Sequence, residues 1–206
     1  MELYAHPIST TSRPILLFLA ESDLVIEHRT VDLFSGENRS AAFLSINPNG
    51  LVPTLVDGDF RLTESSAILK YLADLIHSPA YPADLRRRSR VNERMDWINT
   101  NLYRNFGYDL VYPQIFPQHR RRSDEAQAAL LEWGCEKSRT WLQILDKGLI
   151  GSEQAYLCGD RITIADYLGA PFVTIGEAIG CDFAAYPNIR RWLANMRRLR
   201  SWSKVF

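Results

Sequence analysis

Cysteine is scarce in this sequence and never occurs in close pairs. Cys135, Cys158 and Cys181 are the only three, and no Cys-x-x-Cys motif is present. An odd number of isolated cysteines argues against a disulfide framework, a zinc site or a dithiol redox centre. We therefore expect buried, inert thiols and no bound metal.

Long hydrophobic runs are also lacking. No stretch approaches the roughly 18 uninterrupted apolar residues of a membrane-spanning helix. The first residues, Met1 to Ala5, lack the basic region and the long apolar region of a signal peptide. These absences predict a cytoplasmic protein with no membrane partner.

An excess of charge of one sign is missing as well. Lysine and arginine together number 24, and aspartate and glutamate together also number 24. A balanced chain creates no global field that favours nucleic acid or an anionic membrane, so we expect neither as a partner. Basic runs at 86–90 and 119–122 are interpreted as solvated helix ends.

What is present is the ordinary mixture of a globular protein, with 46% apolar and 23% charged residues. Residues 1–76 show a hydrophobic period that switches between two and about 3.6, which is typical of an α/β domain. We expect, in order, a strand over 2–5, a helix capped by Ser12, a strand over 27–33, a short helix, a hairpin over 54–62 and a helix over 65–76.

Helical spacing dominates the second half. The prolines and small residues of HSPAYPADLRRR predict a linker, and the residues beyond it predict an all-helical domain. The segment FGYDLVYPQIFPQHRRR is expected to be partly irregular, and Thr163 with Asp166 is expected to form a capping box. The expected helices carry the apolar residues Val91, Met95, Ile98, Leu102, Leu130, Trp133, Trp141, Leu142 and Leu145.

The segment HPISTTSRPILL places several hydroxyls just before the first expected helix. A helix N-terminus has unsatisfied N–H groups and a positive dipole end, so a hydroxyl there can help to hold an anion. Ser9 is the best placed, because it precedes the helix. The alternative is that Ser9, Thr10, Thr11 and Ser12 are only loop and cap residues.

Two further segments carry candidate binding groups. In NGLVPTLVDG, a cis bond between Val52 and Pro53 would expose the backbone of Val52 to an extended peptide, whereas a trans proline would simply start a strand. In LTESSAI, Glu64 can balance an ammonium group while Ser65 takes a carboxylate. Helix capping by Thr63 or Ser65 is the alternative explanation.

The order and spacing of these segments resemble the glutathione S-transferase family. The similarity is carried by LYAHPISTTSRPILLFLAE, VDLFSGENRSAAFLSINPNGLVPTLVDGDFRLTESSAILKYL and YLCGDRITIADY, with 47–72 as the most specific part. It implies α/β plus all-α architecture: a thioredoxin-like glutathione-binding domain over 1–76, the linker over 77–86 and the all-helical domain over 87–206. It also implies a homodimer.

Within that family, the chain is similar to the theta and delta-like members, which have a serine followed by an arginine four positions on. Ser9 and Arg13 match this pattern. The resemblance implies that Ser9 stabilises the thiolate of glutathione, the co-substrate, and that Arg13 orients the loop or adds positive field. Tyr4 lies in the expected strand and neither position 9 nor 10 is cysteine, which disfavours the tyrosine and cysteine variants.

The resemblance also assigns the groups that would hold glutathione. Its cysteinyl part would pair with the backbone before a cis proline, and its γ-glutamyl end would meet the start of the last helix of the first domain. Its glycine carboxylate would bind where theta-like members have a His-Lys type pair, of which the first residue is asparagine here. The candidates are therefore Asn38, Arg39, Val52, Pro53, Glu64 and Ser65.

The second substrate implied by the resemblance is a small hydrophobic electrophile, such as a halide, an epoxide or an organic peroxide, as in detoxification. An aromatic wall of the helical half would face it, formed by Tyr103, Phe106, Tyr108, Tyr112, Ile115 and Phe116. A glutathione-binding or stress-response scaffold without turnover is the alternative function. A serine hydrolase is disfavoured, because no Gly-x-Ser-x-Gly elbow is present.

Overall fold

The computed structural model describes residues 1–206 and divides the chain into two compact units. Unit 1 comprises Met1–Tyr81 together with Leu199–Phe206, and unit 2 comprises Pro82–Arg198. The first boundary between the two units falls between Tyr81 and Pro82, inside the segment 77–86 that the sequence analysis expects to be a linker. The last residues of the chain thus belong to unit 1, although sequence analysis groups them with the helical half.

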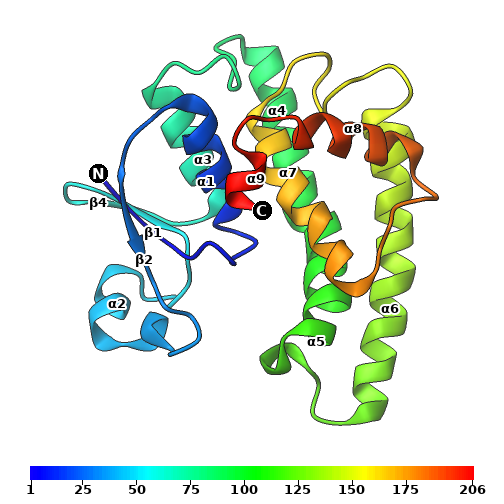
Figure 1. Ribbon diagram of the computed structural model, residues 1–206. Helices are drawn as coiled ribbons and strands as arrows, with labels where there is room; N and C mark the ends of the chain where they lie inside the picture. Colours follow the sequence, from blue (N-terminus) through cyan, green and yellow to red (C-terminus); the bar gives the residue numbers. More distant parts are fainter. The chain divides into compact units, whose positions relative to one another are not determined.

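Unit 1 is built on a four-stranded sheet (Figure 1). Its strands are β1 (Glu2–Ala5), β2 (Glu27–Thr30), β3 (Thr54–Asp57) and β4 (Phe60–Leu62), in the order β2-β1-β3-β4. The β1 strand pairs with β2 in parallel and with β3 antiparallel, and β3 pairs antiparallel with β4. This mixed sheet confirms the α/β prediction for the first half.

Helices cover the sheet of unit 1. The helices α1 (Arg13–Ser22) and α3 (Ser65–Leu75) contact each other, and α2 (Ala41–Ile46) follows the short 3-10 helix η1 (Glu37–Arg39). In Figure 1, α1 and α3 lie side by side and α2 lies apart from them. The order strand, helix, strand, short helix, hairpin and helix is therefore confirmed.

Alternation along β1 explains the packing on both faces of the sheet. Leu3 is fully buried, whereas the next residue, Tyr4, is partly buried and contacts Phe43 of α2 with ring centroids 6.1 Å apart. The side of Leu3 receives the apolar faces of α1 and α3, because successive side chains of a strand point to opposite faces. The buried residues of these two helices include Ile15, Leu17, Phe18, Ile68, Leu69 and Leu72.

Two details of the strands differ from the sequence prediction. The second strand ends at Thr30 and all its residues are exposed, because it lies at the edge of the sheet. Its charged side chains are paired, with Arg29 2.7 Å from Glu27. The hairpin is confirmed, but its turn lies one residue later than expected, because Asp57 still pairs with Phe60.

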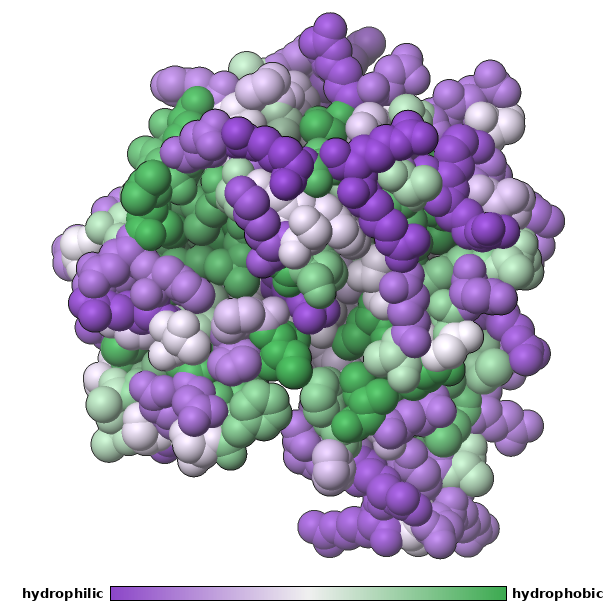
Figure 2. Space-filling model, in the orientation of Figure 1, coloured by the Kyte–Doolittle hydropathy of each residue, from purple (hydrophilic) through white to green (hydrophobic).

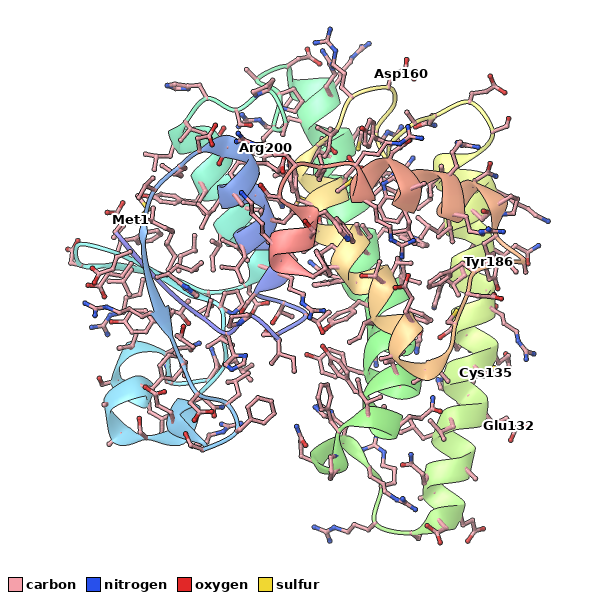
Figure 3. All side chains as sticks on the ribbon, viewed as in Figure 1. Met1, Glu132, Cys135, Asp160, Tyr186 and Arg200 are labelled. Carbon is pink, nitrogen blue, oxygen red and sulfur yellow. The ribbon has the colours of Figure 1, made fainter.

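The segment after Arg198 packs on the end of α1. Arg200 (labelled in Figure 3) donates to the carbonyl of Glu21 at 3.0 Å and to the carboxylate of Asp23 at 2.6 Å. Ser201 donates from its hydroxyl to the carbonyl of Ala20 at 3.0 Å. The last carbonyls of a helix have no intrahelical partner, so these bonds complete α1 from the other end of the chain. The short helix α9 (Trp202–Val205) follows.

Unit 2 is entirely helical, which confirms the second part of the fold prediction (Figure 1). It starts with α4 (Leu85–Trp97), which runs on into a stretch of π-helix, η2 (Ile98–Val111). The remaining elements are α5 (Tyr112–Ile115), η3 (Pro117–His119), α6 (Asp124–Gln143), η4 (Ile144–Ile150), α7 (Ile164–Thr174), η5 (Ile175–Ile179) and α8 (Pro187–Arg197).

The helical periodicity predicts the core of unit 2 well, with one exception. Val91, Met95, Ile98 and Leu102 are all buried on one face of α4 and η2. Trp133 is instead half exposed, and the ammonium of Lys137 lies 4.2 Å from the centroid of its ring. The segment 106–122 is partly irregular, as expected: it is helical up to Ile115, and beyond that the backbone is extended at Phe116 and Arg120, on either side of the short η3.

The expected capping box at the start of α7 is confirmed and forms part of a larger buried network. The carboxylate of Asp166 accepts hydrogen bonds from the backbone and hydroxyl of Thr163, the backbone of Leu157 and the indole of Trp192, at 2.8 to 2.9 Å. Burial raises the pKa of Asp166, and the four donors oppose that rise. Asp166 is therefore a folding residue.

The visible surface mixes hydrophilic and hydrophobic residues (Figure 2). Hydrophilic residues cover the end of unit 2 where α5 leads into α6, and the arginines at 120–122 are exposed there. No helix has the length and apolar character needed to cross a membrane. No group of three or more His, Cys, Asp or Glu residues is arranged to hold a metal ion.

Candidate functional site

The candidate site lies in unit 1, at the start of α1. Ser9 is partly buried, and its carbonyl accepts the backbone N–H groups of Ser12 and Arg13 at 3.0 and 3.1 Å. The Ser9 hydroxyl oxygen also accepts the N–H of Ser12 at 3.3 Å. Ser9 therefore closes the turn that leads into the helix, with its hydroxyl close to the positive end of the helix dipole.

Ser12 does not cap α1 as expected. Its backbone is already helical and its side chain forms no capping bond. Instead, the buried Ser12 hydroxyl accepts the backbone N–H of His6 at 3.4 Å. The turn before α1 provides the capping group one turn earlier, because Ser9 takes the N–H groups that a cap normally receives.

Val52 and Pro53 meet this loop from the start of β3. Their peptide bond is cis, as the family resemblance implies and against the alternative of a trans proline. The hydroxyl of Thr11 donates to the carbonyl of Val52 at 3.0 Å. The N–H of Val52 makes no hydrogen bond within the chain, and its carbonyl has a second lone pair, so both groups can pair with an extended peptide.

Glu64 and Ser65 bring the start of α3 to the same loop. The hydroxyl of Ser65 donates to the carbonyl of Thr11 at 2.7 Å, which leaves the Ser65 N–H for an anion at the helix N-terminus. Neither Thr63 nor Ser65 caps the helix, and the capping position is occupied by Glu64. Glu64 is exposed, with φ at 66° and ψ at 120°, a conformation that is rare for a residue with a side chain.

Sequence reasoning missed the residue that joins these segments, Thr11. Its hydroxyl lies 3.0 Å from that of Ser9 and 3.0 Å from the carbonyl of Val52, and its own carbonyl receives the Ser65 hydroxyl. No local pattern marks it among four consecutive hydroxyl residues. The signal is the partner segments, which lie 41 and 54 residues further along the chain.

Arg13 anchors the loop before α1. Its Nε donates to the carbonyl of Pro7 at 3.1 Å, and its guanidinium lies 5.0 Å from the ring centroid of Phe206. A guanidinium that bonds a loop carbonyl restricts the conformations of that loop. The geometry thus favours loop orientation as the role of Arg13.

Asn38 and Arg39 both hold the loop that precedes Val52. The Asn38 amide donates to the carbonyl of Gly50 at 2.7 Å, and the Arg39 guanidinium donates to the carbonyl of Asn49 at 3.3 Å. Arg39 is exposed and keeps other N–H donors for a carboxylate. Asn38 uses its amide donor within the loop, so Arg39 is the better candidate for an anion.

The aromatic residues predicted to face a second substrate form a cluster within unit 2. Tyr103 and Tyr112 are buried, hydrogen-bonded to each other through their hydroxyls, and in edge contact with Tyr108. Phe106 is buried and Tyr108 is 46% exposed. Core packing therefore accounts for most of these rings, and Tyr108 is the one with a large open surface.

The thiols lack the features of a reactive centre. All three cysteines are free and partly buried. Burial raises the pKa of Cys158 to about 11, and burial also raises the pKa of Cys181. A nucleophilic cysteine needs a lowered pKa, so these two thiols are not candidates.

Two family models match the chain. The model described as the N-terminal domain of glutathione S-transferase matches residues 1–74, and the model described as its C-terminal domain matches residues 108–199. The first match contains every candidate residue of the site. The second lies within unit 2 except for its last residue.

Individual proteins match over most of the chain. Human glutathione S-transferase theta-1 is 36% identical over 197 residues, which cover 93% of this chain and 80% of the relative. The structure of human glutathione transferase theta-2 in complex with glutathione and an unknown ligand has a TM-score of 0.84 at 31% identity, covering 99% of this chain and 88% of that one. A delta-class glutathione transferase of Nilaparvata lugens has a TM-score of 0.84 at 30% identity, with 99% and 92% covered.

Proposed function

This chain belongs to the glutathione S-transferase family, and we propose that it is a glutathione transferase in which the Ser9 hydroxyl stabilises the thiolate of glutathione. The observation that carries the proposal is the meeting of three segments at one loop. Hydrogen bonds through Thr11 join the Ser9 hydroxyl, the Val52 carbonyl and the Ser65 hydroxyl. These are the groups that a tripeptide thiol would need.

The proposed binding mode places glutathione along these segments. The free N–H and the carbonyl of Val52, beside Pro53, pair with the cysteinyl residue as in strand addition. The γ-glutamyl ammonium is balanced by Glu64, and its carboxylate receives the N–H of Ser65 at the N-terminus of α3. The exposed guanidinium of Arg39 takes the glycine carboxylate, while Asn38 fixes the loop beside it.

The chemistry follows from the thiol's ionisation. An ordinary thiol with a pKa of about 8.5 is only a few per cent thiolate at neutral pH. A hydrogen bond from Ser9 and the dipole of α1 favour the charged form, and Arg13 holds the loop in place. A decrease of two pKa units corresponds to about 2.7 kcal/mol, which one charge-assisted hydrogen bond and a helix dipole can supply.

The second substrate is proposed to be a small hydrophobic electrophile such as a halide, an epoxide or an organic peroxide. The thiolate would attack its electrophilic carbon or, in a peroxide, an oxygen, and the protein would hold the two reactants together. We further infer a cytoplasmic, homodimeric detoxification enzyme, for which membership of the glutathione S-transferase family is the support. Sedimentation of the purified chain tests the dimer, and a single-copy mass at micromolar concentration would contradict it.

The proposed thiolate role is tested by titration. Glutathione bound to the wild-type protein and to Ser9→Ala is titrated with base, and thiolate is followed by its ultraviolet absorbance. We expect a lowered pKa in the wild type that returns towards that of free glutathione in Ser9→Ala. Ser45→Ala is the matched control, because the Ser45 hydroxyl is exposed and bonds only within α2.

The other outcomes separate the alternatives. Glutathione that binds the wild type without a lowered pKa would identify a glutathione-binding scaffold without turnover. Absence of glutathione binding would contradict both functions. Retention of the lowered pKa and of turnover in Ser9→Ala would refute the role of the serine.

A further inference from the structure

We propose that Thr11 is a positioning residue. When the glutathione backbone binds Val52, the Thr11 hydroxyl changes its hydrogen-bond acceptor from the Val52 carbonyl to the Ser9 hydroxyl. The inference rests on the proposed function, since it concerns the same thiolate. It states that, when glutathione binds, the Thr11 hydroxyl gives up its bond to the Val52 carbonyl and the hydrogen bond between Ser9 and Thr11 reverses direction. The reversal turns the only hydroxyl hydrogen of Ser9 towards sulfur.

Counting hydrogens fixes the direction of the bonds in the free protein. The Thr11 hydroxyl donates to the Val52 carbonyl, which can only accept. A hydroxyl carries one hydrogen, so Thr11 has none left for Ser9. In the 3.0 Å contact between the two hydroxyls, Ser9 is therefore the donor. The free protein directs the hydrogen of Ser9 at Thr11.

Glutathione binding supplies the donor that reverses this order. A peptide N–H can take the second lone pair of the Val52 carbonyl, and because two donors then share one oxygen, the bond from Thr11 is weakened. The Thr11 hydroxyl then turns its hydrogen to the oxygen of Ser9, and Ser9 turns its own to the thiolate. Each of the two hydroxyl hydrogens makes one hydrogen bond before glutathione binds and one afterwards. In the bound state the Ser9 oxygen accepts two bonds, from Thr11 and from the N–H of Ser12.

The reversed arrangement strengthens the bond to sulfur. A hydroxyl that accepts a hydrogen bond is a better donor, because the bonds of a chain polarise one another. Thr11 is also held in place from its other side, where its carbonyl receives the hydroxyl of Ser65 at 2.7 Å. Its hydroxyl is thus fixed between Ser9 and Val52 and needs only rotation about its C–O bond to change partners.

Thr11→Val tests the inference, because valine keeps the shape of threonine and removes the hydroxyl. We expect the pKa of bound glutathione to rise by about half a unit to one unit, since cooperative strengthening is a fraction of one hydrogen bond. Thr11→Ser restores the hydroxyl and is expected to restore the wild-type pKa. Thr10→Val is the matched control, because the adjacent buried Thr10 takes no part in these bonds.

A double-mutant cycle identifies the path of the effect. If Thr11 acts through Ser9, Thr11→Val has no further effect on the pKa of bound glutathione in a Ser9→Ala background. An equal increase in both backgrounds, or no increase in the wild-type background, would overturn the inference and leave the role of Ser9 intact. An unchanged pKa in Ser9→Ala alone would instead overturn the proposed function, and this inference with it. Circular dichroism verifies that each variant is folded.

Discussion

The hydroxyl of Ser65 donates a 2.7 Å hydrogen bond to the main-chain carbonyl of Thr11, 54 residues earlier in the chain. This bond fixes the start of α3 against the loop before α1. Both residues contribute groups to the candidate site. This buried hydroxyl therefore helps to fix the relative position of two halves of the proposed glutathione site.

Ser65→Ala is expected to loosen this junction. Loss of one hydrogen bond of this kind costs about 1 kcal/mol of unfolding free energy, and leaves the Thr11 carbonyl without its protein donor. We expect the dissociation constant of glutathione to rise about tenfold, which is about 1.4 kcal/mol. Calorimetry measures it, with Ser45→Ala as control. Equal affinity in Ser65→Ala and wild type would contradict the shared junction.

Substitutions of Glu64 separate charge from backbone conformation. Glu64→Gln keeps the positive φ and removes the charge, so glutathione binding should weaken while stability stays constant. Glu64→Gly removes the charge as well but relieves a conformation that costs about 1 kcal/mol or more. We expect it to unfold at higher denaturant concentration than Glu64→Gln. Wild-type affinity in both variants would exclude Glu64 from the site.

Gly50 and Gly58 offer a matched pair for the loop beneath Arg39. Both have φ at 62°, but a Cβ at Gly50 would lie 2.8 Å from the guanidinium of Arg39 and 2.9 Å from the carbonyl of Asn38. Nothing lies within 4 Å of a Cβ at Gly58. Gly58→Ala is expected to cost about 1 kcal/mol of stability for the left-handed conformation alone.

Gly50→Ala should cost more, because it adds a clash with backbone. We also expect it to weaken glutathione binding, since Arg39 must move. Urea unfolding and calorimetry of the two alanine variants measure both effects. The same loss of stability in the two variants, with unaltered binding, would argue against the packing of Arg39 on Gly50.

Asp166→Ala is expected to lower the free energy of unfolding by about 3 kcal/mol or more, because it leaves several buried donors unpaired. Asp160→Ala is its control, since Asp160 is exposed (labelled in Figure 3) and close in sequence. Urea unfolding measures both. If Asp166→Ala were as stable as its control, the network would have no energetic role.

Alkylation of Cys158 should depend strongly on pH. Because burial raises its pKa to about 11, its thiolate fraction near pH 8 is about a thousandth in the folded protein. The pKa is ordinary in the unfolded chain, so iodoacetamide should label the unfolded protein far faster, and labelling of the folded protein should increase as pH rises. Peptide mass spectrometry follows the site. Equal labelling rates in the folded and unfolded protein near pH 8 would contradict this environment.

Much of the fold was predictable because its signals are local. The turn residues between Thr54 and Leu62 gave the hairpin, and helical spacing over 65–76 gave α3. The capping box of Thr163 and Asp166 is also a local pattern. Each of these depends on residues a few positions apart, whose side chains meet as soon as the local structure forms.

Other features depend on contacts that no local pattern specifies. Thr11 has the same appearance as its neighbours in the sequence, and only its bonds to Val52 and Ser65 distinguish it. The N-terminus of α8 has no local side-chain cap. Instead, the backbone N–H of Ile189 donates to the carboxylate of Asp146, 43 residues earlier in the chain. Exposure of the second strand likewise follows from its place at the edge of the sheet.

The return of Leu199–Phe206 to unit 1 has a consequence for biosynthesis. A ribosome makes all of Pro82–Arg198 before Arg200 and Ser201 can reach the end of α1. The sheet can form early on the nascent chain, but the carbonyls at the end of α1 acquire these partners only after the helical half has been made. Completion of the glutathione-binding half thus requires the helical half to have been synthesised first.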